Sequence, residues 1–126
     1  MQKLGRHLIV EYYGCDFESL TKVGYIKQQM LTAAKKIGAK IVGNKFHQFS
    51  PQGVSGAVIL AESHISIHTW PEYNYAAVDF FTCGGHCDSN IGVEFLEKSF
   101  QATSKTIQDI ARGLPEDLQN SLASTF

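Results

Sequence analysis

The sequence predicts an α+β protein, a two-layer α/β sandwich in which a mainly antiparallel sheet carries two helices on one face. Two observations lead to this fold class. Short runs of β-branched and aromatic residues, typical of strands, are interrupted by only two amphipathic segments of helical period. Most connections between the strand-like runs are of hairpin length, which favours antiparallel pairing. We expect the element order β-α-β-β-β-β-α-β in a single domain of 126 residues.

The first part of the chain is predicted to form a strand, a helix and a second strand. The run Arg6 to Tyr13 is apolar and aromatic, with the length of a strand. From Leu20 to Ile37 apolar residues recur every three or four positions, and Gly38 stands where a glycine commonly ends a helix. Extended character resumes from Ile41 to Phe49, and the turn formers of residues 50–53 then stop it.

A strained hairpin is expected in the middle of the chain. The runs Val54 to Ala61 and His64 to Trp70 are both strand-like, and only Glu62-Ser63 separates them. Tight hairpins prefer Asn-Gly or other glycine-containing pairs, because their turns need positive φ, which costs a residue such as Glu about 1 kcal/mol. Strain at this pair would be a sign of function.

The second arm of the hairpin alternates with period two. Ile65 and Ile67 fall on one face of the predicted strand. The other face carries polar and aromatic residues, namely His64, Ser66, His68 and Trp70. We predict that the first face is core and that the second belongs to a site.

The last part of the chain is predicted to add a strand, a helix and a final strand. The run Tyr75 to Phe81 is strand-like, and the flexible sequence Cys83-Gly84-Gly85 ends it. A helix then follows, with Asp88, Ser89 or Asn90 as its cap and with Ile91, Phe95, Leu96 and Phe100 on its apolar side. A last strand is expected from Lys105 to Ala111, and the polar tail from Glu116 to Thr125 is expected to be frayed or peripheral.

The charge pattern favours a small polar ligand as the partner. The net charge is −1 and the 11 Lys and Arg residues are scattered, so we expect neither nucleic acid nor an anionic membrane as a partner. The N-terminal apolar run is too short to span a membrane and carries no cleavage signal, which predicts a cytoplasmic protein. Three cysteines, an odd number, indicate reduced thiols.

One face of the predicted sheet has no helices to cover it. That face would expose His64, Trp70 and neighbouring aromatic residues, and an apolar patch of this kind normally marks an interface. We therefore expect a homodimer or a higher assembly, in which each active site could be built from both copies.

Most residues with catalytic potential lie between Ala61 and Gly84, in the sequence AESHISIHTWPEYNYAAVDFFTCG. The residues by themselves allow a metal-binding module or a cysteine hydrolase. The C-x2-H-C cluster of Cys83, His86 and Cys87 could bind zinc with His64 or His68, although paired C-x2-C knuckles are absent. A hydrolase would use Cys83 with His68 and would also need an oxyanion hole, which no motif identifies.

The same stretch resembles the core of the prokaryotic S-adenosylmethionine decarboxylases, which cut themselves and use a pyruvoyl group as cofactor. The similarity runs from LGRHLIVEYYGCD to the sequence ARG near residue 112. It implies cleavage between Glu62 and Ser63 into chains 1–62 and 63–126. In the family the serine attacks the preceding carbonyl, and β-elimination leaves the pyruvoyl group at the new N-terminus. Ser55 and His68 match the family's processing residues, with His68 as proton acceptor.

The resemblance also implies how the substrate is handled. The pyruvoyl group derived from Ser63 would form a Schiff base with S-adenosylmethionine and accept electrons as carbon dioxide leaves, without a metal. Cys83 matches the proton donor, Phe49 and Trp70 would stack on adenine near the sulfonium, and Glu72 would accept hydrogen bonds from the ribose. The product would be the aminopropyl donor for spermidine synthesis.

Two alternatives to this assignment stay open. Relatives that share the fold and the self-cleavage decarboxylate arginine or ornithine, and a non-enzymatic metal- or ligand-binding module is the candidate from another class. The segment after Cys83, GGHCDSNIG, also departs from the family pattern.

Overall fold

The computed structural model describes residues 3–83 and 85–125. Within them lies one antiparallel sheet of six strands in the order β2-β3-β4-β5-β1-β6. The strands are β1 (Gly5–Tyr13), β2 (Ile41–Gln48), β3 (Val54–Leu60), β4 (Ser63–Trp70), β5 (Tyr75–Cys83) and β6 (Ser104–Arg112). The helices are α1 (Phe17–Thr21), α2 (Val23–Lys36), α3 (Ser89–Ser99) and α4 (Pro115–Thr125), with a 3-10 helix, η1 (Pro71–Tyr73), between β4 and β5. The predicted α+β sandwich is confirmed.

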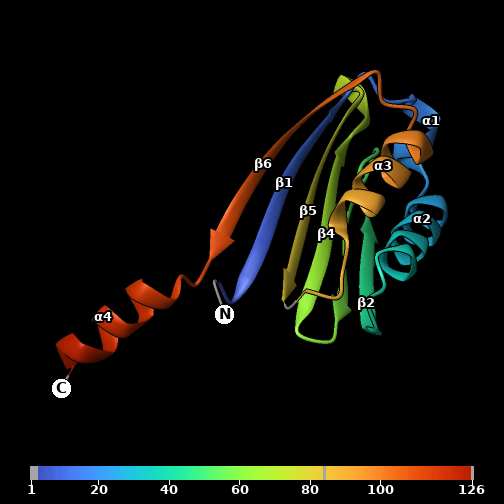
Figure 1. Cartoon of the computed structure of the whole chain (residues 1–126). Helices are drawn as coiled ribbons and strands as arrows, with labels where there is room; N and C mark the ends of the chain where they lie inside the picture. Colours follow the sequence, from blue (N-terminus) through green and yellow to red (C-terminus); the bar gives the residue numbers. More distant parts are fainter. Residues whose placement is uncertain (1–2, 84, 126) are drawn as a thin grey trace.

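The helices α1, α2 and α3 cover one face of the sheet and leave the other open (Figure 1). On the covered face the strands contribute alternate residues to a core that α2 and α3 complete with Ile26, Met30, Val93 and Leu96. In β4 the predicted alternation is confirmed, because Ile65 and Ile67 are fully buried whereas His68 and Trp70 are exposed. The open face is therefore where the chemically interesting side chains lie.

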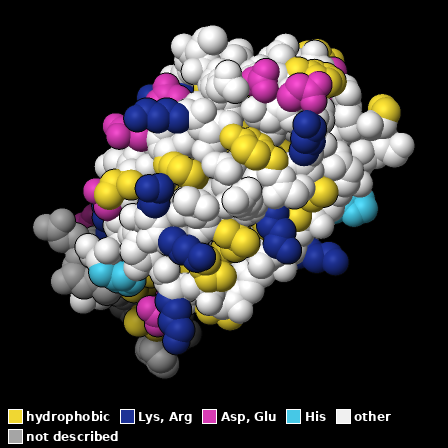
Figure 2. All heavy atoms as spheres, turned by 90° about the vertical axis from the view of Figure 1, so that its right-hand side faces the viewer, with side chains coloured by type: hydrophobic (Ala, Val, Ile, Leu, Met, Phe, Trp, Pro, Cys, Tyr) yellow, Lys and Arg dark blue, Asp and Glu magenta, His cyan; other side chains and the backbone are white. Residues whose placement is uncertain are grey.

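The outer surface of the helix layer mixes positive and negative charge (Figure 2). Lys and Arg side chains alternate there with Asp and Glu and with small hydrophobic patches. No continuous basic surface of the kind that binds a phosphate backbone covers this view of the described residues.

The single helix predicted from Leu20 to Ile37 is wrong, because the chain forms two helices. Lys22 has extended backbone angles (φ −104°, ψ 108°) and separates α1 from α2. The side chain of Gln48 bridges the break, accepting from the Val23 N–H at 3.1 Å and donating to the Thr21 carbonyl at 2.8 Å. The apolar period runs through the break, so a pattern of burial alone could not reveal it.

Asp16 begins the first of these helices earlier than predicted. Its side chain accepts from the Ser19 N–H at 3.1 Å, the usual role of an Asp cap. At the second helix of the prediction, Asp88 caps α3 by accepting from the Asn90 N–H at 3.2 Å, as expected.

The turn between β3 and β4 is displaced by one residue from the prediction. Leu60 pairs with Ser63, so the turn residues are Ala61 and Glu62, and Ser63 is the first residue of β4. The expected strain is present at Glu62, whose φ is +65°. A non-glycine residue in this left-handed region is uncommon and is disfavoured by about 1 kcal/mol or more.

The C-terminal tail is peripheral, one of the two predicted possibilities, but it is helical rather than frayed, since residues 115–125 form the helix α4. This helix extends past the β6 edge of the sheet, away from α2 and α3 (Figure 1). Beyond Lys105, every residue of β6 is exposed on both faces of the sheet. The edge formed by β6 and α4 therefore lacks the cover that the helix layer gives to the central strands.

Candidate active site

The cleavage pair predicted from the sequence lies at one end of the sheet, together with Cys83. Ser63 begins β4 directly after the strained Glu62. The backbone N–H of Cys83, the last residue of β5, donates to Ser63 Oγ at 3.2 Å. A hydroxyl oxygen, a strained peptide and a thiol-bearing residue thus meet at this rim of the sheet, which we call the Ser63 end.

Ser55 and His68 are directly opposite each other on β3 and β4. Their side chains face the open side of the sheet, where Ser55 Oγ and His68 Nδ1 are 2.7 Å apart. When Nδ1 donates its proton to Ser55, Nε2 carries a free lone pair and can act as a base. The serine therefore orients the ring, and because its hydroxyl can accept as well as donate, it allows the tautomer that leaves Nε2 free.

This pair opens into a cleft of about 310 Å³ that also contains the three predicted substrate-binding residues. The lining residues are Phe49, Gln52, Gly53, Ser55, His68, Thr69, Trp70 and Glu72. Aromatic rings, one carboxylate and a serine–histidine pair in a concave site suit a ligand with a flat apolar part and hydroxyl groups.

Backbone constraints shape this cleft. Gly53 has φ +104°, and a Cβ at that position would lie 3.2 Å from the Thr69 carbonyl oxygen. Thr69 is buried, and its Oγ1 accepts from the Val54 N–H at 2.9 Å and donates to the Leu20 carbonyl at 2.9 Å. These bonds fix the loop that carries Phe49 against the end of β4.

Trp70 is part of a row of aromatic rings on the open face. Its ring stacks on Tyr75 with centroids 5.4 Å apart, and Tyr75 stacks on Tyr13 at 5.6 Å. The Tyr75 hydroxyl donates to Glu11 at 2.7 Å, and burial together with this carboxylate raises the pKa of Tyr75 well above its ordinary value. Trp70 is thereby held in place although it is 40% exposed.

The two groups of predicted residues are not brought together within one copy of the chain. His68 follows Ser63 by five positions on the same strand, which corresponds to about 17 Å at the rise of a β-strand. The Ser55–His68 pair and its cleft therefore lie toward the opposite end of β4, which we call the His68 end. No proton can pass directly between these ends.

A further polar network on the open face was missed by the sequence analysis. Asp79 accepts from Ser66 Oγ at 3.2 Å and lies 3.3 Å from His7 Nε2. Arg112 contacts His7 Nδ1 at 3.2 Å. Alternation in the first and fifth strands could have placed His7 and Asp79 on the face of His68, whereas their contact depends on the register between strands.

Phe81 links that network to the Ser63 end. Its ring stacks on His64 with centroids 5.5 Å apart, and the Arg112 guanidinium lies over it at 5.5 Å. A Cβ on Gly5 would come within 2.9 Å of the Phe81 ring, so this glycine makes room for the ring beside Cys83.

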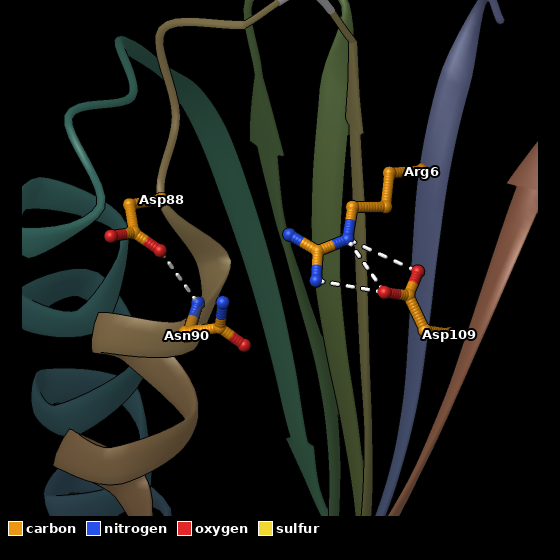
Figure 3. Close-up of polar contacts among 4 residues, drawn as sticks. All are labelled: Arg6, Asp88, Asn90 and Asp109. Atoms are coloured by element: carbon orange, nitrogen blue, oxygen red, sulfur yellow. Dashed lines mark hydrogen bonds and ion pairs between the residues drawn. The ribbon is translucent and has the colours of Figure 1, made fainter.

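The opposite, helix-facing side of the same sheet end is closed by an ion pair (Figure 3). Arg6 donates to both carboxylate oxygens of Asp109, with a shortest distance of 2.8 Å. Figure 3 shows the Arg6 guanidinium between Asp109 and the helix cap Asp88, whose charge also raises the pKa of Arg6. The hydrogen bonds from Arg6 lower the pKa of Asp109. This pair ties the exposed strand β6 to β1.

The three cysteines are free thiols with different environments. Cys15 is buried, and burial raises the pKa of its thiol to about 11. Burial and the neighbouring Cys83 raise the pKa of Cys87. Among the described residues, 3–83 and 85–125, no group of three His, Cys, Asp or Glu side chains could hold a metal ion. In the same residues no helix is long and apolar enough to cross a membrane.

Comparison with known proteins places this geometry in a family. The family model described as S-adenosylmethionine decarboxylase matches residues 6–113. The S-adenosylmethionine decarboxylase proenzyme of Fervidobacterium nodosum is 49% identical over 113 residues, covering 90% of this chain and 82% of the relative. The proenzyme of Thermotoga maritima is 46% identical and covers 98% of this chain and 99% of the relative.

Solved structures agree with the sequence comparison. The adenosylmethionine decarboxylase of Aquifex aeolicus superposes with a TM-score of 0.84 at 32% identity, covering 90% of this chain and 94% of the other. The Trypanosoma brucei AdoMetDC-delta26 monomer has a TM-score of 0.58 at 17% identity and shares the fold over 81% of this chain and 44% of its own length. The chain belongs to the S-adenosylmethionine decarboxylase family.

Proposed function

We propose that this chain decarboxylates S-adenosylmethionine after cutting itself between Glu62 and Ser63. The observation that carries the proposal is the division of the site, with a strained Glu62-Ser63 peptide at one end of β4 and a histidine base beside an aromatic, acidic cleft at the other. The names of the relatives support the same reaction class and describe their chains as proenzymes.

Self-cleavage begins at the Ser63 end. Ser63 Oγ attacks the carbonyl carbon of Glu62, the C–N bond breaks, and an ester replaces the amide. The positive φ of Glu62 favours the overall cleavage, because a cut chain no longer has to hold a left-handed glutamate in a two-residue turn. The Cys83 N–H that now contacts Ser63 Oγ fixes the hydroxyl against β5 before the attack.

Completion of the cut requires a base for the Ser63 Cα proton. Loss of that proton expels the Glu62 carboxylate, and hydrolysis with loss of ammonia leaves a pyruvoyl group at residue 63. His68 is suited to accept the proton, because Ser55 holds its Nδ1 and leaves Nε2 available. At about 17 Å along the strand, however, the His68 of the same copy is out of reach.

A second copy of the chain could bring a His68 close to Ser63. If two open faces pack together with their strands running in opposite directions, the His68 end of each copy covers the Ser63 end of the other. Each dimer then contains two complete sites, and each site takes Ser63 and Cys83 from one copy and Ser55 and His68 from its partner. Closed two-fold assembly is the commonest form of homo-oligomer and gives this exchange by symmetry.

The cleft at the His68 end supplies substrate recognition in this arrangement. Phe49 and Trp70 offer ring faces to adenine and to the positive sulfonium, and Glu72 offers a carboxylate to the ribose hydroxyls. The pyruvoyl group at residue 63 supplies an electron sink for decarboxylation. Cys83, on the adjacent strand end, donates the proton that replaces carbon dioxide.

The decisive experiment combines mass spectrometry with a substrate assay. We expect the purified protein to consist of two fragments, residues 1–62 with an ordinary C-terminus and residues 63–126 with a blocked N-terminus. Carbon dioxide release should be fastest from S-adenosylmethionine when it is compared with arginine and ornithine at equal concentration. An uncut chain would contradict self-processing, and a preference for arginine or ornithine would contradict the substrate.

A further inference from the structure

The helix α4 has an apolar face that its own copy leaves uncovered. Every residue from Glu116 to Leu122 is exposed, and the side chains of Leu118 and Leu122 are 37% and 60% exposed. These leucines are four positions apart and therefore share one face of the helix. A free helix of 11 residues is only marginally stable in water, so a helix of this length needs a surface to pack against.

The root of α4 lies at the Ser63 end of the sheet. Arg112, the last residue of β6, pairs with Gly5, and Gly5 pairs with Cys83 on its other side. From there α4 leaves past the β6 edge rather than returning to the helix layer (Figure 1). The helix thus starts beside the rim at which the proposed dimer places the partner's His68 end.

An apolar strip connects this root with the open face. Gly113 packs closely on Leu4, since a Cβ at residue 113 would lie 2.9 Å from the Leu4 side chain. Leu4 is itself exposed, as is Ile110 of β6, which pairs with His7 and shares its face. The leucine face of α4 therefore continues the surface that a second copy would cover.

We propose that α4 is an arm that packs Leu118 and Leu122 onto the partner copy and stabilises the dimer. The proposal rests on the two-copy site argued above. With the strands of the two copies antiparallel, the partner presents at this rim the opposite end of its own sheet, where β1 ends and β6 begins. Tyr13 and Ser104 are paired at that end.

The chemistry of that end suits a leucine face. Tyr13 is exposed there on the open face of the free chain, where its ring stacks on Tyr75, and an aromatic surface of this kind is a good partner for aliphatic side chains. The acidic residues of α4, Glu116 and Asp117, lie in its first turn, so the rest of the helix brings no charge into the contact. By two-fold symmetry each dimer contains this contact twice.

The test uses full-length variants of α4 that change only exposed side chains. In the first, Leu118→Asp and Leu122→Asp place charges on the proposed contact face. In the matched control, Asn120→Asp places a charge on the other side of the helix, about 200° from Leu118. A third variant, Leu118→Ala with Leu122→Ala, removes the apolar groups without adding charge and keeps a high helix propensity.

Sedimentation equilibrium over a dilution series measures the dimer dissociation constant of each variant. We expect the double Asp variant to raise it at least about tenfold and the double Ala variant to raise it by a smaller factor, with Asn120→Asp within about twofold of wild type. Circular dichroism at high protein concentration checks that the fold is retained, which is expected because α4 lies outside the core.

The outcomes separate the arm from the function. The proposed contact of α4 would be wrong if both leucine variants had the wild-type dissociation constant, or if Asn120→Asp changed the constant by the same factor. The same samples are analysed for cleavage at residue 63. A dimer that is weakened by the leucine variants but is never cut would support the role of α4 and contradict self-processing. A dimer that is cut but is not weakened by the leucine variants would support self-processing and contradict the role of α4. A wild-type monomer at high concentration would overturn the arm together with the two-copy site.

Discussion

Ser63 begins β4 and His68 lies near the other end of the same strand, about 17 Å away. In the sequence these residues look like neighbours, because only four residues lie between them. They are far apart in space because the backbone between them is extended, whereas in a helix they would lie within two turns of each other. A reaction that needs both residues therefore needs two copies of β4, and this leads to the first prediction.

Two inactive variants should restore each other's cleavage when they are produced together. Ser63→Ala has no hydroxyl to attack Glu62, and His68→Ala has no base, so each alone should remain uncut. A mixed dimer contains one site with the intact Ser63 of one copy and the intact His68 of the other. With random pairing about half of the His68→Ala chains should then be cut, as mass spectrometry of the mixture would report.

Ser66→Ala is the matched control for these variants. Ser66 lies on the same strand between the two residues, and its hydroxyl donates to Asp79 rather than to the cleavage site. It should be cut without a partner variant. Failure of the mixture to produce any cut His68→Ala chain, with intact dimers present, would rule out the exchange of residues between copies.

More of the fold than of the site could be predicted from the sequence. Alternation in β4 and the caps at Asp88 and Gly38 are local features, and they indicated the right faces and boundaries. The break at Lys22 depends on Gln48, which is distant in sequence, and the helix α4 contains only two large apolar residues, Leu118 and Leu122, in an otherwise polar segment. Neither could be predicted from a local window.

In the site, too, contacts that depend on local strand pairing could be predicted, whereas contacts between distant segments could not. Ser55 with His68, and Ser63 with Cys83, are contacts between adjacent strands, so a correct hairpin register implies them. The cleft that joins Phe49, Trp70 and Glu72 to His68 depends on the loop before β3 and on η1. Its residues could be chosen from the resemblance, but their distance from Ser63 required the structure.

Removal of the Cys83 thiol should separate cleavage from turnover. In the contact with Ser63 the thiol takes no part, because the donor is the backbone N–H of Cys83, which an alanine retains. Cys83→Ala should therefore still cut itself but lose most decarboxylation, or protonate the product at the wrong atom. Product analysis by mass spectrometry measures both effects.

Cys87→Ala is the control for this variant. Cys87 lies close enough to Cys83 for that thiol to raise its pKa, yet it has no contact with Ser63 among the described interactions. It should retain both cleavage and turnover. Full activity of cut Cys83→Ala would remove this residue from the role of proton donor.

The ion pair between Arg6 and Asp109 should make a small contribution to stability that depends on pH. Arg6 lowers the pKa of Asp109 from its ordinary value of 3.8. Because the folded pKa is the lower one, the contribution is fully present above pH 3.8 and is lost as the pH falls through the folded pKa. Both side chains are partly exposed, so Asp109→Asn should lower the free energy of unfolding at neutral pH by less than about 1 kcal/mol.

Urea unfolding at fixed protein concentration measures this difference, since the proposed dimer would make stability concentration-dependent. Glu18→Gln is the comparison, because the Glu18–Lys22 pair is longer, at 3.6 Å, and more exposed. It should have a still smaller effect. A difference between wild type and Asp109→Asn that grows as the pH falls below 3.8 would contradict a lowered pKa of Asp109 in the folded protein.

Loss of Trp70 or Glu72 should impair turnover of S-adenosylmethionine while leaving self-cleavage largely intact. Both residues line the cleft without a described hydrogen bond to Ser55, Ser63 or His68. The Trp70 ring lies 6.2 Å from the His68 ring, but Ser55 holds His68 Nδ1 independently, so the processing pair should keep its geometry. Stacking of a base on an aromatic ring is worth about 1 to 3 kcal/mol, so Trp70→Ala should weaken binding by about fivefold to more than a hundredfold. Glu72→Gln removes the charge that we propose holds the ribose hydroxyls, and it should raise KM.

Tyr73→Ala provides the matched control for these two variants. Tyr73 directly follows Glu72 in the 3-10 helix η1, but its side chain is 76% exposed and does not line the cleft. Initial rates over a range of S-adenosylmethionine concentrations should show a normal KM for Tyr73→Ala and raised values for the other two. Since arginine and ornithine have neither a ring to stack nor a ribose to hold, a wild type that prefers them would also remove the binding roles of Phe49, Trp70 and Glu72.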